Sequence, residues 1–279
     1  MKTATGENIK KFELYLYDEE KSNNTIEKYM RDIHCFCKWL RGRGIEKSTV
    51  IEYKKELCER YAPRSVNSMI SSVNAFFAFM GWHDLKIKTL KIQKQIFAKN
   101  EKELTKAEYT RLLKTAKAKG NRKLFLLIQT ICATGIRVSE LQYINVASLN
   151  VGRAQVHMKG KLRVIIIPDK LCKMLARYAK EQGITSGSIF VTKTGRPLDR
   201  TNIWKLMKGL CERAGVDKSK VFPHNLRHLF ARTFYSIEKD IVRLADILGH
   251  TSVNTTRIYT LENWKICRRQ VQRLGLLRC

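Results

Sequence analysis

The 279 residues are enough for one large or two ordinary domains, and the 44 % hydrophobic content is enough for a buried core. The formal charge of +29, from 54 Lys and Arg against 25 Asp and Glu, would strongly repel itself unless a polyanion were nearby, so nucleic acid is the expected partner; a solvated basic surface with no specific ligand is the alternative. The chain has no apolar run of membrane-spanning length and no apolar signal core at its start, so we expect a cytoplasmic protein that contacts no membrane.

The N-terminal region is predicted to form a small helical domain over residues 1–85. After a cap-like segment at 22–25, apolar residues follow at near-helical spacing as far as Leu40. Two further helices are expected at 48–60 and 64–80, and Gly81 ends the second pattern.

Residues 86–102 are interpreted as a basic linker. They contain six lysines against the single acid Glu101, and they show no convincing apolar face. When the chain is divided at residue 100, both halves are net positive, so we expect both to touch a phosphate backbone.

Residues 103–279 are expected to form a second domain, which is mainly helical. Thr105 and Glu108 form a capping-box pattern, and an apolar helix follows at 124–133. The period then changes at 154–158 and 162–167, which predicts a small antiparallel sheet around a turn at 159–161. Helices resume from Lys170, with another short strand at 188–191. The predicted fold class is therefore mainly α with a small antiparallel β-sheet in the second domain.

Metal and nucleotide sites are not indicated by the composition. The eight cysteines are scattered without a CxxC pair, and we interpret them as reduced thiols. The sequence contains neither a carboxylate cluster suited to Mg²⁺ nor a Gly-rich phosphate loop. We therefore expect no cofactor and no metal.

Four separated stretches contain the functional signal: ATGIRVSEL at 133–141, MKGKLR at 158–163, HNLRH at 224–228 and LGHTSVNTTRIY at 248–259. Any one of them alone is a weak motif, but their order and spacing are specific. Together they resemble the tyrosine recombinase family, which includes phage integrases and Xer-like enzymes. The motifs cover residues 105–259, and the N-terminal helices resemble the family's SAM-like core-binding domain more loosely.

The resemblance implies that Tyr259, nine residues after His250, attacks a scissile phosphate and forms a 3′-phosphotyrosyl link, so that rejoining is the reverse step. Such a phosphorane-like transition state gains negative charge on its non-bridging oxygens, and planar guanidinium groups match that geometry. Arg137 and Arg227 are the predicted clamp. His224 and His250 hold the phosphate or accept the tyrosine proton, with His224 favoured as the acceptor.

The leaving 5′ oxygen needs a proton, and a hairpin lysine can supply it. Lys159, just before Gly160, is our choice, with Lys161 left open as the alternative. We expect His228 and Glu140 to act only through these residues, with Glu140 orienting Arg137.

We therefore expect a site-specific DNA recombinase whose two domains clamp double-stranded DNA. The chain begins almost directly in the core-binding helices, which favours a Xer-like enzyme, a resolvase or a compact mobile-element integrase. A type IB topoisomerase-like enzyme that relaxes DNA, and a catalytically silent DNA-binding regulator of the same fold, are the alternatives. Leu261 stands where the family often has His, a departure at a non-catalytic position.

The C-terminal tail is predicted to be an amphipathic helix. An apolar stripe runs along Trp264, Cys267, Val271 and Leu274. This helix either folds back on its own domain or docks on a neighbouring protomer. The resemblance favours exchange, which implies a homotetramer on two DNA sites.

Overall fold

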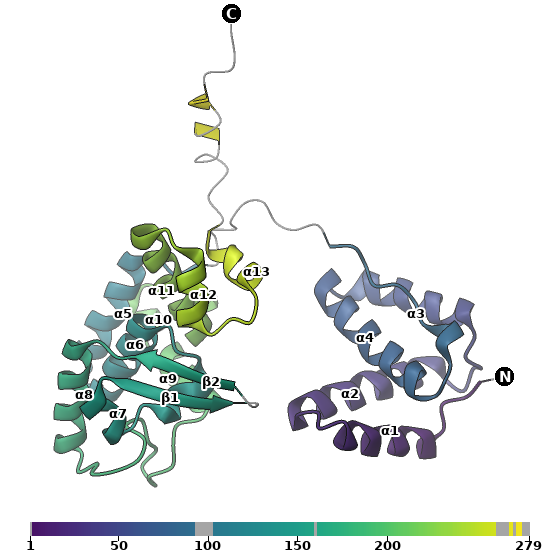
Figure 1. Ribbon diagram of the computed structural model, residues 1–279, viewed down its shortest axis with the longest axis horizontal. Coiled ribbons are helices and arrows are strands. Elements are labelled where there is room, and N and C mark those ends of the chain that lie inside the picture. Colours follow the sequence, from purple (N-terminus) through teal and green to yellow (C-terminus); the bar gives the residue numbers. More distant parts are fainter. Residues whose placement is uncertain (1, 93–102, 159–160, 261–267, 270–271, 275–279) are drawn as a thin grey trace, which may run out of the picture. The chain divides into compact units, whose positions relative to one another are not determined.

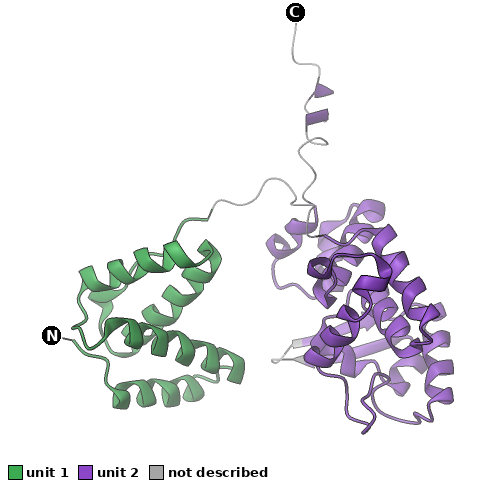
Figure 2. Cartoon of the chain, turned by 180° about the vertical axis from the view of Figure 1, so that it is seen from behind, with its two compact units in different colours: residues 1–94 green, residues 95–279 purple. Residues whose placement is uncertain are grey.

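A computed structural model of the chain describes residues 2–92, 103–158, 161–260, 268–269 and 272–274. The chain divides into two compact units, residues 1–94 and 95–279 (Figure 2). The predicted linker at 86–102 spans this division, and its residues 93–102 lie outside the described part of the chain.

The first unit is helical. It contains α1 (Gly6–Asp18), α2 (Asn23–Leu40), α3 (Lys47–Arg60), α4 (Pro63–Phe79) and the short 3₁₀ helix η1 (His83–Leu85) (Figure 1). The helices expected at 48–60 and 64–80 differ from α3 and α4 by one residue at their ends. Ser22 is the N-cap of α2, although its hydroxyl pairs with the Thr25 hydroxyl at 2.8 Å and caps no backbone N–H.

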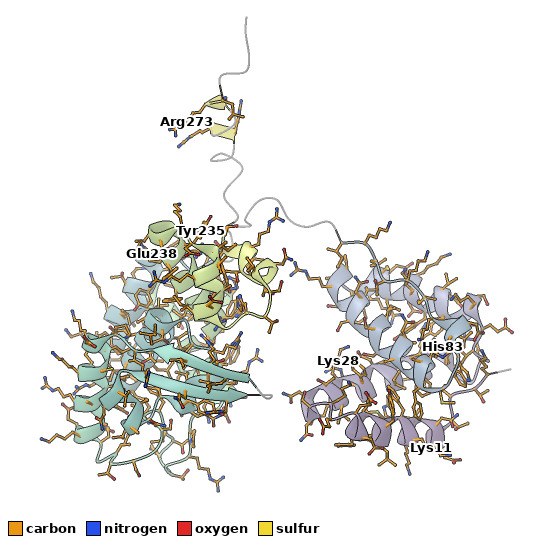
Figure 3. All side chains as sticks on the ribbon, viewed as in Figure 1. Lys11, Lys28, His83, Tyr235, Glu238 and Arg273 are labelled. Atoms are coloured by element: carbon orange, nitrogen blue, oxygen red, sulfur yellow. The ribbon has the colours of Figure 1, made fainter. Side chains whose placement is uncertain are left out.

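Phenylalanine side chains fill the core of this unit. Phe12 meets Phe76 edge to face with 5.3 Å between ring centroids, and Phe36 meets Phe77 at 5.9 Å. Such edge-to-face pairs are a favoured aromatic geometry. The buried Asp32 beside this core is paired with Lys28 of α2 at 2.8 Å (Figure 3), which offsets the cost of burying its charge.

The first residues of the predicted linker lie along α4. The Asn74 side-chain amide exchanges two hydrogen bonds with the backbone of Ile87, at 2.8 and 3.0 Å. Asn67 does the same with the backbone of Leu90, at 2.9 and 2.7 Å. Each asparagine presents one donor and one acceptor, as a neighbouring β-strand would, so the basic segment is held to the first unit as far as Leu90.

The second unit is a helical body with one β-hairpin (Figure 1). Its regular elements are α5 (Lys106–Ala118), α6 (Arg122–Thr134), η3 (Val138–Tyr143), α7 (Val146–Val151), β1 (Arg153–Met158), β2 (Lys161–Ile166), α8 (Asp169–Glu181), α9 (Arg200–Lys208), α10 (Cys211–Ala214), η4 (Lys218–Lys220), α11 (Pro223–Glu238), α12 (Ile241–Leu248), α13 (Val253–Thr256) and η5 (Arg257–Tyr259). The predicted capping box of Thr105 and Glu108 begins α5.

The predicted hairpin is present. β1 and β2 are antiparallel, with Val156 opposite Arg163 in the register. The further strand predicted at 188–191 is wrong, because that segment forms only isolated bridges, Asn145 to Ser188 and Val191 to Pro197. The loop backbone there pairs with single residues on either side, so no ladder develops.

The fold class, mainly α with a small antiparallel sheet, is confirmed. Helix α11 packs along α6 in the middle of the second unit, and this pair positions the motif residues. Among the described residues, no helix has both the length and the apolar character needed to cross a membrane.

Candidate active site

Two helix ends bring the motifs together. α6 ends at Gly135 and α12 at Gly249, both with φ +61°. A Cβ on Gly135 would lie 2.5 Å from Phe230 Cδ1, and one on Gly249 would lie 2.5 Å from Arg163 Cδ. Glycine is therefore needed at both positions for conformation and for space. The chain leaves each helix at once. Arg137 follows Gly135 after one residue and His250 follows Gly249 directly, and both are predicted site residues.

The last carbonyl groups of a helix lack intrahelical partners and carry partial negative charge, which favours cationic donors. Arg227 of α11, only 2 % exposed, donates hydrogen bonds to carbonyl groups at both helix ends. Its Nη1 donates to the Gly135 carbonyl at 2.6 Å, and its Nη2 donates to the Leu248 carbonyl at 2.7 Å. Burial, followed by the charges of Arg137 and Arg163, lowers the pKa of Arg227 to about 10.

Arg137 begins the η3 turn beside Arg227. Its Nη2 donates to the Gly249 carbonyl at 3.0 Å, and its Nη1 donates to Glu140 Oε1 at 2.8 Å. Its backbone N–H donates to Glu140 Oε2 at 2.9 Å. Burial opposes ionisation of Glu140, but the Arg137 N–H and the charges of Arg163 and Arg137 outweigh burial and lower the pKa of the carboxyl. The expected orientation of Arg137 by Glu140 agrees with this geometry.

His250 bridges the arginine cluster and the tyrosine turn. Its Nε2 lies 3.1 Å from Arg227 Nη2, and its Nδ1 lies 2.8 Å from the hydroxyl of the fully buried Thr256. Because a guanidinium only donates, Nε2 accepts, and the ring proton belongs on Nδ1, which donates to Thr256. Burial, then Arg227 and Arg137, lower the pKa of His250 to about 4, so the ring is neutral.

His224 lies at the start of α11, with its ring centroid 4.3 Å from that of His228. Desolvation, then the Arg227 and Arg137 charges, lower the pKa of His224. The residue is nevertheless exposed to solvent at the start of the helix. His224 is therefore neutral near pH 7 and accessible.

Tyr259 is 5 % exposed and packs on Ala231, Leu244 and Leu248. The His228 ring meets it edge to face at 4.9 Å, and the His250 ring stacks on it at 6.2 Å. Burial raises the pKa of Tyr259, and the charge of Arg227 and a hydrogen bond with it oppose that rise. The tyrosine thus lies in the same site as the arginines of its own chain.

Five of the six predicted site residues are therefore close together: Arg137, His224, Arg227, His250 and Tyr259. The sixth, Lys159, lies outside the described residues, as does the side chain of Lys161. Two residues that contact the site were missed by sequence reasoning. Thr256, three residues before Tyr259, had no signal other than its place in the motif, and Arg163 was noted only as added charge near the hairpin.

Within the described part of the chain, His, Cys, Asp and Glu residues form no group suited to a metal ion. The six cysteines described there are free thiols: Cys35, Cys37, Cys58, Cys132, Cys172 and Cys211. Among the described site residues, the positive charge comes from the guanidinium groups of Arg137, Arg163 and Arg227.

Residues 102–265 match the phage integrase family, and residues 9–83 match the phage integrase N-terminal SAM-like domain. The chain belongs to the phage integrase family. As a family member, it is a tyrosine-type, Xer-like site-specific DNA recombinase, as the sequence predicted.

The similarity extends along nearly the whole chain. Tyrosine recombinase XerA of Pyrococcus furiosus is 30 % identical, over 99 % of this chain and 96 % of the relative. The crystal structure of a XerA recombinase is 26 % identical, with a TM-score of 0.53, and covers 99 % of this chain and 100 % of that one. A lambda integrase (75–356) dimer bound to a COC′ core site has a TM-score of 0.72 at 18 % identity, over 92 % and 95 % of the two chains, which shows the shared integrase fold.

Proposed function

We propose that this recombinase cuts and rejoins double-stranded DNA through a 3′-phosphotyrosyl intermediate on Tyr259. The observation behind this proposal is the seating of the Tyr259 ring against His250 and Arg227 of the same chain. The net charge of +29 and the likeness to an integrase bound to a core site support duplex DNA as the substrate.

In the proposed reaction the Tyr259 oxygen bonds to the scissile phosphorus, and the bond from phosphorus to the 5′ oxygen breaks. Arg137 and Arg227 stabilise the added negative charge on the non-bridging oxygens. Carbonyl groups at the helix ends already orient both guanidinium groups, so little reorganisation is needed at the moment of reaction. Rejoining reverses the step with another 5′-hydroxyl.

The two histidines have different roles in this proposal. Both ring nitrogens of His250 are engaged, by Thr256 and by Arg227, which suits a group that holds the phosphate region in place. His224 is exposed and neutral, which suits the acceptor of the tyrosine proton. His228, whose pKa burial and then the charge of His224 lower to about 4, packs on Tyr259 as a neutral ring.

A suicide substrate, whose cleaved end diffuses away, tests the nucleophile. We expect the wild-type protein to form a covalent adduct and Tyr259→Phe to form none while binding DNA normally. Tyr235 of α11 (Figure 3) belongs to the same apolar cluster as Tyr259, so Tyr235→Phe is the matched control and should form the adduct. An adduct persisting in Tyr259→Phe would overturn the assignment. A wild-type protein that binds DNA without cutting it would favour the silent regulator.

We propose Lys159 as the general acid for the leaving 5′ oxygen. Replacing that oxygen by sulfur gives a leaving group that needs no proton. The modified substrate should restore cleavage to Lys159→Ala, whereas Lys161→Ala should cleave the ordinary substrate without such help. If the sulfur substrate rescues Lys161→Ala and not Lys159→Ala, Lys161 is the general acid instead of Lys159.

The assembly proposed is a homotetramer on two DNA sites, linked by exchange of the tail helix, with the two domains clamping the DNA. Most of the predicted apolar stripe, Trp264, Cys267 and Val271, lies outside the described residues, and Leu274 is 63 % exposed. A recombination assay with two sites separates this proposal from a topoisomerase, which would relax DNA without joining strands from two sites. A cytoplasmic location stays a prediction.

A further inference from the structure

Arg163 occupies an inward-facing position on β2. Its side chain is 10 % exposed, and it lies on the same face of the strand as the buried Ile165. The apolar neighbours Leu162 and Val164 point the other way and are 61 % and 44 % exposed. The hairpin therefore buries a charged residue and exposes two apolar ones.

The buried guanidinium of Arg163 connects three elements. Its Nη1 donates to Glu140 Oε2 in η3 at 2.5 Å, and its Nη2 donates to the Ile247 carbonyl in α12 at 2.7 Å. Its Cδ and Nε pass so close to Gly249 that a Cβ there would lie 2.5 and 2.9 Å from them. Arg163 thus fixes β2, the carboxylate that holds Arg137, and the turn from which His250 emerges.

Stability alone does not explain an arginine at this position. The Nε–H of Arg163 is buried without a hydrogen-bond partner among the described residues. Burial, against the attraction of Glu140, lowers the pKa of Arg163, and the nearby Arg137 charge adds to that effect. Well-packed apolar residues often replace such buried ionic groups without loss of stability.

We propose that Arg163 is a positioning residue for the phosphate clamp. It holds Glu140, which orients the Arg137 guanidinium, and it holds the Ile247–Gly249 turn, whose Gly249 carbonyl accepts from Arg137. The inference rests on the proposed role of Arg137 in cleavage.

Arg163→Met removes the guanidinium group, with its paired N–H donors, and keeps nearly the same side-chain length. Arg163→Lys retains the positive charge but lacks the paired donors. Because a misplacement of about 1 Å in an active site can cost about 100-fold in rate, we expect Arg163→Met to slow single-turnover cleavage by roughly that factor. Arg163→Lys should recover only part of the rate. Arg153→Met changes an exposed arginine on the paired strand β1 and is the matched control.

Modified substrates separate positioning of the clamp from a merely structural role. A methylphosphonate replaces one anionic non-bridging oxygen by a methyl group, so the scissile centre needs less positive charge. The rate deficits of Arg137→Ala and Arg163→Met, each relative to wild type, should both shrink on this substrate. The 5′-sulfur substrate should leave the Arg163→Met deficit unchanged, because the leaving group is not where this residue acts.

Three outcomes would contradict the proposal. If only the Arg137→Ala deficit shrinks on the methylphosphonate, Arg163 does not act through the clamp. If sulfur rescues Arg163→Met, the residue serves the leaving group. If the Arg137→Ala deficit does not shrink, the proposed clamp itself fails, and the inference about Arg163 fails with it.

Gly249→Ala tests the same contact with Arg163 still in place, and a double-mutant cycle then removes the clash. We expect Gly249→Ala to slow cleavage and lower the unfolding midpoint more than Gly215→Ala, which has φ +58° and nothing within 4 Å of a new Cβ. In an Arg163→Ala background the clash is gone, so the extra effect of Gly249→Ala should vanish. If Gly249→Ala has the same extra effect in the Arg163→Ala background, the side chain of Arg163 is not the reason that position 249 requires glycine.

Discussion

Gly135→Ala should destabilise the second unit and disturb the arginine clamp together. The new Cβ would lie 2.5 and 2.7 Å from ring atoms of Phe230 and 3.1 Å from the fully buried Leu248. The carbonyl of the same residue accepts from Arg227 at 2.6 Å. A backbone shift that relieves the clash must therefore move a hydrogen-bond acceptor of Arg227, one of the two arginines of the proposed clamp.

The size of the effect follows from two contributions. A left-handed conformation costs a non-glycine residue about 1–2 kcal/mol. Forcing extra volume into a packed core costs about 1–3 kcal/mol more. Gly183→Ala is the matched control, because Gly183 has φ +65° with nothing within 4 Å of a new Cβ, and it should bear only the first cost.

Urea unfolding of the full chain, followed by circular dichroism, compares the two variants. We expect the free energy of unfolding to fall by about 1–2 kcal/mol for Gly183→Ala and about 2–5 kcal/mol for Gly135→Ala. Suicide-substrate cleavage should slow in Gly135→Ala alone. Equal losses of stability would show that Phe230 yields freely, and wild-type cleavage by Gly135→Ala would refute the link to Arg227.

Three further predictions concern the clamp, the histidines and the tail. Arg137→Ala and Arg227→Ala should each slow cleavage about 100-fold or more, and cleavage by either at the wild-type rate would show that the wrong arginine was chosen. Because the pKa values of His228 and His250 are lowered to about 4, the unfolded chain binds more protons than the folded chain between pH 6.5 and 4. Stability is therefore lost as the pH falls through that window, by at most about 3 kcal/mol for each ring. The urea midpoints at pH 7 and 5 should differ less in a variant with both histidines changed to Phe than in the wild type. Deleting residues 263–279 should preserve half-site binding but weaken cooperative assembly on two sites, and unchanged cooperativity in gel shifts would exclude tail exchange.

The sequence predicted the fold class and the grouping of the site because the relevant signals are local. Helical periodicity located α3 and α4 to within a residue, and the capping box marked the start of α5. The site motifs are themselves local structures. In TGxR and LGH the glycine ends a helix and the next residues enter the site, so the spacing follows from the geometry of the helix ends.

The features that were missed depend on contacts between distant segments. Alternation on β2 does not reveal which face is buried, and here the apolar Leu162 and Val164 are exposed while Arg163 faces inward. The failed strand at 188–191 has the same origin, since β-branched residues need a partner strand, and this segment forms only single bridges. Tertiary context decides both cases.

In the proposed reaction, the charges of the site favour the transition state over the bound phosphodiester. Arg137, Arg163 and Arg227 lie around the carboxylate of Glu140. Burial lowers the pKa of Arg163 and of Arg227, and repulsion by the charge of Arg137 lowers both further. A phosphodiester brings one negative charge to this excess of positive charge, whereas a phosphorane-like state brings more. The attraction between the arginines and the reacting phosphate therefore grows as the reaction proceeds. The same arginine charges lower the pKa of His224. In the proposed reaction, negative charge that builds up beside them would raise that pKa again, so His224 would become a better proton acceptor as Tyr259 loses its proton.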